Sequence, residues 1–172
     1  RVTGVQTCAL PISSNLGVEF TAILLGSQIG DLAKKLVAYG ADKVIVADNS
    51  LLKNYTTDAY TKVICELAKE RKPEIILVGA TFIGRDLGPR VSSRLATGLT
   101  ADCTGLDIDP DTKNLLMTRP AFGGNLMATI VCGDHRPQMS TVRPGVFEKL
   151  VKDKGRTGEI ENVKIGRASC RE

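Results

Sequence analysis

Apolar runs and amphipathic segments alternate along the first half of the chain. The apolar runs are VEFTAILLG at 18–26, KVIVAD at 43–48 and EIILVGA at 74–80. Continuous runs of this kind, rich in β-branched residues, predict strands that are buried on both faces. The segments between them repeat apolar residues every three or four positions, which predicts helices that cover the strands. These helical segments are 29–41, 56–72 and 81–98.

Capping and breaking residues agree with this division. Thr57 is the expected N-cap of the second helix, and Pro73 prevents that helix from continuing. Gly40 and Gly98 end the first and third helices. The order strand, helix, strand, helix, strand, helix predicts an α/β fold with a mainly parallel sheet and flanking helices, a three-layer sandwich of the nucleotide-binding type.

The pattern changes after Gly98, where the apolar runs become short and turn-rich segments separate them. The runs are LTADCTGLDIDP, NLLMTRP, LMATIVC and PQMSTVRP, and the separators are DPDTKN, FGGN and GDHR. This spacing is typical of hairpins, so we expect antiparallel strands added to the parallel core. The prolines between 120 and 144 favour sheet edges and bulges over a deep central strand.

The two ends of the chain do not fit the rest. VTGVQTCALPI near the N-terminus and IGRASCRE at the C-terminus have no helical or strand periodicity. Both resemble conceptual translations of sequencing-adapter DNA; an ordinary disordered tail, or at the N-terminus a degenerate signal peptide, is the alternative. We interpret 1–12 and 165–172 as artefactual tails with few contacts. The formal net charge is +4, and each tail carries one net positive charge, so residues 13–164 carry +2. Such a small excess gives no reason to expect a nucleic-acid partner.

Several classes of site are excluded by composition. The five cysteines include no CxxC pair, and His135 is the only histidine, so we predict no metal site, no disulfide framework and no histidine-based catalytic residues. An odd number of unpatterned cysteines suits a reducing cytoplasm. No apolar run is long enough to span a membrane.

The third strand-to-helix junction, VGATFIGRDLGPR at 78–90, is the richest candidate for ligand binding. Gly79 and Gly84 allow close backbone approach, and Arg85 and Arg90 add positive charge beside a helix N-terminus. One interpretation is a nucleotide-binding enzyme domain that uses the Gly79–Arg90 junction. The other is structural, with these residues capping, pairing or facing solvent.

A second candidate is the stretch TRPAFGGN. Pro120 holds Arg119 extended, and Phe122 precedes Gly123 and Gly124, which can adopt positive φ. The arginine-proline pair recurs twice in RPQMSTVRP at 136–144. Arginines placed in this way suit the docking of an anionic or electron-rich partner, and packing between domains is the alternative.

Three long motifs resemble the alpha subunit of electron-transfer flavoprotein. They are GATFIGRDLGPRVSSRLATGLTADCTGLDID, TRPAFGGNLMATI and RPQMSTVRPGVF, and the resemblance covers roughly residues 15–150. It implies a heterodimeric electron carrier rather than an enzyme. Such a carrier takes electrons from flavin-dependent dehydrogenases, such as the acyl-CoA dehydrogenases of fatty acid β-oxidation, and passes them onward.

The resemblance also implies a division of the chain. Residues 13–150 would be the N-terminal α/β domain, without its first strand and helix, and would pack against the beta subunit. Residues 151–164 would be a linker toward an absent FAD domain, so the fragment should not bind FAD tightly.

Some members of that family bifurcate electrons through a second flavin, which the beta subunit holds near the N-terminal domain of the alpha subunit. In such a member Arg85 and Arg119 would favour anionic forms of the flavin. Phe122, Gly123, Gly124 and Asn125 would contact it or the partner. A purely structural dimerisation domain is a further possibility for the fragment.

Overall fold

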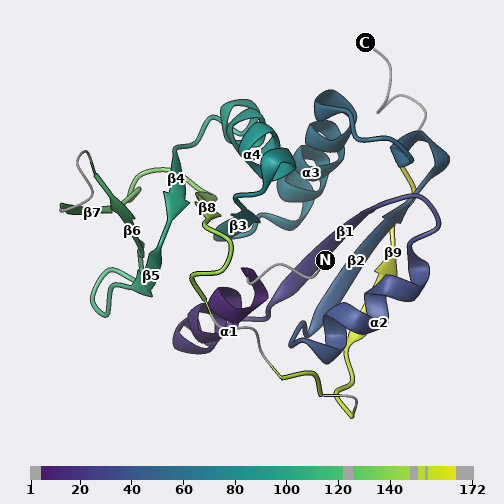
Figure 1. The fold of residues 1–172 in the computed structure, drawn as a ribbon, viewed down its shortest axis with the longest axis horizontal. Helices are drawn as coiled ribbons and strands as arrows, with labels where there is room; N and C mark the ends of the chain where they lie inside the picture. The colour runs from purple at the N-terminus through teal and green to yellow at the C-terminus, as the bar shows by residue number, and fades with distance from the viewer. Residues whose placement is uncertain (1–4, 122–125, 148–150, 154, 166–172) are drawn as a thin grey trace.

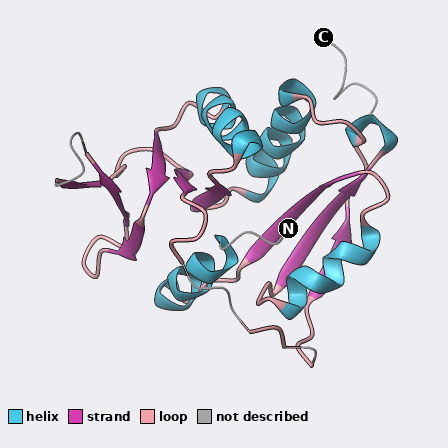
Figure 2. Ribbon diagram, in the orientation of Figure 1, coloured by secondary structure: helices cyan, strands magenta, loops and turns pink. Residues whose placement is uncertain are grey.

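The computed structural model describes residues 5–121, 126–147, 151–153 and 155–165 (Figure 1). These residues form an α/β fold with two parallel sheets, one antiparallel sheet and helices on both faces of the parallel strands (Figure 2). The predicted fold class is therefore confirmed. No helix within this part of the chain is long and apolar enough to cross a membrane.

The first parallel sheet has the order β1-β2-β9. Its strands are β1 (Thr21–Gly26), β2 (Lys43–Asp48) and β9 (Glu159–Asn162). Alternate residues of β2 pack against different helices, because successive side chains of a strand point to opposite faces. Val44 and Val46 pack with helix α2 (Gly30–Ala38), and Ile45 and Ala47 pack with helix α3 (Thr57–Arg71). A 3₁₀ turn, η1 (Ser50–Leu52), connects β2 to α3.

The second parallel sheet has the order β3-β8-β4. Its strands are β3 (Ile75–Gly79), β8 (Gln138–Val142) and β4 (Leu99–Cys103). Helix α4 (Phe82–Arg94) packs on it through Leu87 and Val91, which contact Met139. Helices α3 and α4 lie side by side on the same side of the molecule (Figure 1).

Strand β8 corrects one prediction. The segment PQMSTVRP was expected to form an antiparallel strand at an edge, yet it contains the fully buried central strand of a parallel sheet. Pro137 and Pro144 lie outside the strand itself, so neither removes a hydrogen bond from the sheet. Proline position therefore marks the ends of this strand rather than an exposed edge.

The third sheet is the predicted antiparallel one, with the order β5-β6-β7. Its strands are β5 (Gly105–Ile108), β6 (Leu115–Pro120) and β7 (Met127–Ile130). The buried side chains of Ile108, Leu115 and Met117 form a cluster with Cys103 of β4, which joins this sheet to the second one.

Both chain ends contain regular structure that the sequence pattern did not predict. Helix α1 spans Val5–Leu16, and its Ile12 is buried in the cluster around Leu115, so the expectation of few contacts across 1–12 is wrong. Strand β9 lies within the segment interpreted as a linker. The foreign origin of the ends and the domain boundaries stay predictions.

Helix α3, the second of the predicted helices, has its N-cap one residue earlier than predicted. Its N-cap is Thr56 rather than Thr57, and the Thr57 hydroxyl instead donates to the carboxylate of Asp86 on α4. This hydrogen bond connects the start of α3 to α4.

Candidate functional site

The carboxyl ends of β3, β8 and β4 meet at one edge of the second sheet, and an irregular residue lies there. Asp102 has a φ of 62°, in the left-handed region, where the pairing of β4 with β8 shifts register. Its N–H donates to the Thr141 hydroxyl at 2.8 Å. Bulges of this kind redirect a side chain, and left-handed residues other than glycine concentrate at functional sites. The Asp102 carboxylate is thus held at the ligand-binding edge of a parallel sheet.

Three arginines surround this carboxylate. Arg143, which directly follows β8, donates from Nη2 and Nε to Asp102 Oδ2 at 2.6 and 3.2 Å. Arg85, in the first turn of α4, donates from Nε to the Ala80 carbonyl at 3.0 Å and lies 3.4 Å from Asp102 Oδ1 through Nη2. Arg119 of β6 is close enough to influence the Asp102 pKa. We call Arg85, Asp102, Arg119 and Arg143 the arginine cluster.

The structure thus brings together two of the predicted site residues, Arg85 and Arg119. The others, Phe122, Gly123, Gly124 and Asn125, lie outside the described residues. Their flanks are described: the Ala121 N–H donates to the Leu126 carbonyl at 2.7 Å and closes the hairpin between β6 and β7. The predicted antiparallel pairing of the two flanking strands is therefore confirmed, while the contact of 122–125 with a ligand stays a prediction.

The arginine-proline pairs divide into two kinds. Arg119 and Arg143 belong to the arginine cluster. Arg136 lies before β8, where it donates to Glu74 at 2.8 Å, to Asn114 at 2.9 Å and to the carbonyls of Cys132, Gly133 and His135. Arg136 therefore stabilises the loop before β8 and is not part of the arginine cluster.

The glycine-rich junction at 78–90 uses many of its polar groups internally. The Gly84 N–H donates to the Thr81 hydroxyl, and a Cβ placed on Gly84 would lie 1.8 Å from the Gly79 carbonyl oxygen. Arg90 pairs with Asp58 at 3.1 Å. Gly84 is thus required for the contact of α4 with β3, and its N–H is already bound within the helix start.

Sequence reasoning missed three residues at this edge: Asp102, Arg143 and Phe82. Phe82 begins α4, and 97% of its surface is exposed beside the half-exposed Ile83. The third arginine-proline pair was a signal for Arg143. Nothing in the sequence distinguishes Asp102, because its role depends on a backbone angle and a register shift.

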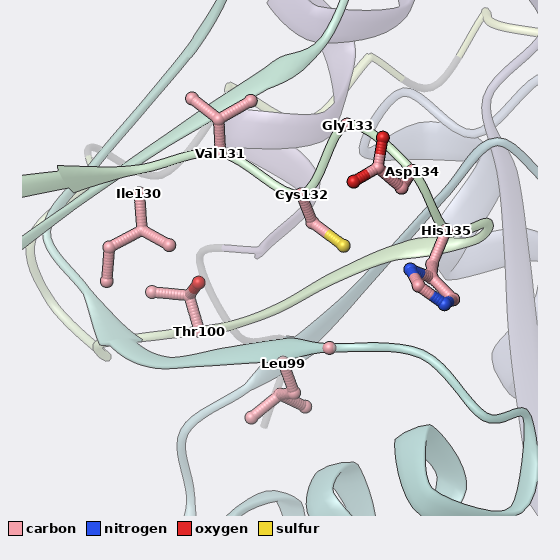
Figure 3. Close-up of a pocket in the computed structure, with 9 residues that line it drawn as sticks. Leu99, Thr100, Ile130, Val131, Cys132, Gly133, Asp134 and His135 are labelled. Atoms are coloured by element: carbon pink, nitrogen blue, oxygen red, sulfur yellow. The ribbon is translucent and has the colours of Figure 1, made fainter.

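A cavity of about 320 Å³ lies at the opposite edge of the second sheet, between the start of β4 and the loop after β7. Figure 3 shows the Cys132 thiol pointing toward the strand that carries Leu99 and Thr100. Asp134 and His135 line the same cavity. The described residues contain no group of three histidine, cysteine or acidic side chains that could hold a metal ion. The cavity thus provides no metal centre there.

Acid should weaken the Asp102–Arg143 pair. The hydrogen bond from Arg143 holds the Asp102 pKa below its usual range, with smaller contributions from the charges of Arg85 and Arg119. A carboxylate with a lowered pKa stabilises the fold above its unfolded-state pKa and loses that contribution as the pH falls through the folded-state value. We expect the urea midpoint of the wild type to exceed that of Asp102→Asn above the ordinary aspartate pKa of about 3.9, and the difference to shrink as the pH falls below it. A difference that is independent of pH would contradict this.

A family model of the electron transfer flavoprotein domain matches residues 6–167. The chain belongs to the electron transfer flavoprotein family. The resemblance of the three long motifs is thereby confirmed.

Curated relatives agree with this assignment. The electron transfer flavoprotein subunit alpha of Clostridium acetobutylicum is 62% identical over 156 residues, which is 90% of this chain and 46% of the relative. The acryloyl-CoA reductase electron transfer subunit beta of Anaerotignum propionicum is 54% identical over 80% of this chain and 44% of its own length. Subunit LctC of the lactate dehydrogenase (NAD(+),ferredoxin) of Acetobacterium woodii is 42% identical over 93% of this chain and 38% of its own length. The chain spans less than half the length of these relatives.

The described residues of this electron transfer flavoprotein chain fit one part of a flavin rather than a whole FAD. A second cavity, of about 220 Å³, is lined by Arg85, Asp102 and Thr141 together with apolar residues of α4 and β4. The larger cavity lies at the small end of the range for drug-sized ligands, the smaller one lies below that range, and FAD is larger than such ligands. Guanidinium groups at the rim of the smaller cavity suit an anionic edge.

Proposed function

We propose that this chain is the N-terminal α/β domain of the alpha subunit of a heterodimeric electron-transfer flavoprotein. The intact protein accepts electrons from flavin-dependent dehydrogenases and passes them on, and it acts as a carrier rather than as an enzyme. When bound, FAD supplies the one- and two-electron chemistry. The chain described here supplies the surface that meets the beta subunit, and the main FAD-binding residues lie elsewhere.

One observation carries this proposal beyond family membership: the arginine cluster lies at a sheet edge where apolar side chains are exposed. Phe82 and Ile83 are exposed at the start of α4, the helix of Arg85, and Leu126 and Met127 are exposed at the start of β7, which pairs with the strand of Arg119. Large apolar side chains grouped around charged residues are typical of protein interaction surfaces. The free thiols Cys65, Cys103 and Cys132 support a cytoplasmic location.

The identity of the electron donor belongs to this proposal too. Relatives are named for acryloyl-CoA reductase and for a lactate dehydrogenase as well as for electron-transfer flavoprotein. An acyl-CoA dehydrogenase is the donor that the motif resemblance favours, and these names add other dehydrogenases as candidates. Arg85 and Arg119, together with the segment 122–125, would lie toward the flavin or the partner.

The test is to express the full parental alpha chain with its beta subunit. We expect a yellow complex with FAD absorbance that bleaches when a dehydrogenase and its substrate are added. A colourless complex, or a yellow one that no dehydrogenase reduces, contradicts the carrier function.

Replacement of Arg119 tests the role of the cluster in that complex. We expect Arg119→Ala to weaken subunit association about tenfold, which corresponds to one lost charge-assisted contact, or to shift the flavin potential. Arg90→Ala is the matched control, because Arg90 pairs with Asp58 on the helical surface away from the cluster. Titration calorimetry and a spectroscopic redox titration measure the two effects. Unchanged values for both would leave Arg119 as a packing residue.

A further inference from the structure

The side chain of Asp102 is placed by its backbone before any partner arrives. The residue adopts a left-handed conformation at the point where β4 shifts register, and its N–H is held by Thr141 of β8. On the other side, the N–H of Arg143 donates to the Cys103 carbonyl at 2.9 Å. Hydrogen bonds from both main-chain N–H groups therefore fix the spacing of the two backbone segments that carry Asp102 and Arg143.

Both arginines bound to this carboxylate keep unused donors. A guanidinium group has five N–H donors in a fixed plane. Arg143 uses Nε and Nη2 on Asp102, and Arg85 uses Nε on the Ala80 carbonyl and Nη2 on Asp102. In the described part of the chain neither Nη1 group has an acceptor. The contacts that hold the two planes thus leave one end of each guanidinium open.

The charges of the cluster do not balance. Three guanidinium groups surround one carboxylate, which leaves two net positive charges. The first turn of α4 adds the positive end of a helix dipole at Arg85. The 220 Å³ cavity next to Arg85 and Asp102 has an apolar floor that includes Pro89 and Leu99. An oxyanion attached to a flat or apolar group matches both features.

We propose that Asp102 is a positioning residue, which presets Arg85 and Arg143 to bind an oxyanion presented by the flavin-bearing partner. The identity of the partner rests on the proposed function. The binding of an oxyanion rests only on the geometry of the cluster. A carboxylate of the beta subunit and a phosphate of its flavin both present the anionic oxygens that a guanidinium group binds. Asp102 itself does not contact the oxyanion, since two carboxylate-type groups would repel each other.

The variant Asp102→Asn separates positioning from charge. It raises the net positive charge of the cluster by one, so simple electrostatics predicts tighter anion binding. If Asp102 positions the two arginines, anion binding should instead weaken, because the neutral amide no longer holds the two guanidinium planes. We expect about tenfold weaker binding of inorganic pyrophosphate to the full 172-residue chain, measured by NMR from the Nε–Hε signals of Arg85 and Arg143.

Two further variants make this result decisive. Asp58→Asn on α3 removes a carboxylate from Arg90 and Arg94 of α4, with the same change of charge, and should leave pyrophosphate binding unchanged. Asp102→Gly relieves the positive φ, which offsets part of the stability lost with the carboxylate, so it should still fold and yet bind more weakly. Equal or tighter binding by both Asp102 variants overturns the proposal, and so does a wild-type chain that shows no pyrophosphate-dependent shifts.

The beta subunit then identifies the source of the oxyanion. The affinity of wild type and Asp102→Asn for the subunit is measured with FAD-loaded and with FAD-stripped partner. Weakening in both forms assigns the oxyanion to the protein, and weakening only in the loaded form assigns it to the flavin. Weakening in neither form overturns the proposed role of Asp102 toward the partner. Failure of the wild type to bind any beta subunit contradicts the proposed function, while the pyrophosphate titration still decides the oxyanion site.

Discussion

Replacing Gly84 by alanine is expected to destabilise the domain by about 3 kcal/mol or more, at the upper end for overpacking. In an exposed helix the same substitution normally stabilises by about 1 kcal/mol. The sign reverses because a Cβ at position 84 would lie 1.8 Å from the Gly79 carbonyl oxygen and 3.0 Å from its carbon. These are backbone atoms of β3, so no side-chain rotation relieves the clash. Helix α4 would have to move away from the sheet, and Arg85 would move with it.

Gly30 provides the matched control. It begins α2, and a Cβ at that position meets nothing within 4 Å. Gly30→Ala should therefore be neutral or stabilise by up to about 1 kcal/mol. Urea unfolding followed by circular dichroism measures both variants. If Gly84→Ala unfolds at the wild-type midpoint, the close approach of α4 to β3 is wrong.

The second large effect is expected at Gln138, the first residue of β8. Its side chain is 1% exposed, and its Oε1 accepts the N–H of the fully buried Leu115 at 2.9 Å. This bond joins the second sheet to the third. Gln138→Met keeps the length of the side chain but leaves the Leu115 N–H without an acceptor, at an expected cost of about 2 kcal/mol.

The neighbouring residue supplies the comparison for this variant. Met139 is also fully buried in β8, and Met139→Leu conserves volume without removing a hydrogen bond, so it should cost less than about 1.5 kcal/mol. Chemical denaturation gives the two free energies of unfolding. Hydrogen exchange should show faster exchange of the Leu115 amide in Gln138→Met only. Equal protection in both variants would show that the side-chain bond is dispensable.

The first half of the fold could be predicted because its buried strands have continuously apolar sequences. The run KVIVAD became β2 residue for residue, since a strand covered by helices on both faces must be continuously apolar. Strand β9 could not be found in this way. Its sequence EIEN is polar, and it is held beside β2 by main-chain pairing and by ion pairs from Lys43 to Glu159 and Glu161. Such a partner more than a hundred residues away leaves no local pattern.

The candidate site was predictable only in part, for a similar reason. Arg85 and Arg119 stand out because an arginine next to glycine or proline has an obvious local context. Asp102 lies in the unremarkable sequence ADC, and its importance comes from a positive φ and from arginines on three other elements. Local context therefore reveals which cations are available. It does not reveal the carboxylate that arranges them.

The order of strands in the two parallel sheets has a consequence for the synthesis of the protein. Strand β8 separates β3 from β4, and β9 completes the sheet of β1 and β2 across 116 residues from Lys43 to Glu159. On the ribosome, the early apolar strands are made well before the partners that complete their sheets. Contacts between such distant segments form slowly, and uncovered strands are prone to aggregate in the meantime. The nascent domain thus depends on the late strands β8 and β9 to cover the early strands β3 and β2.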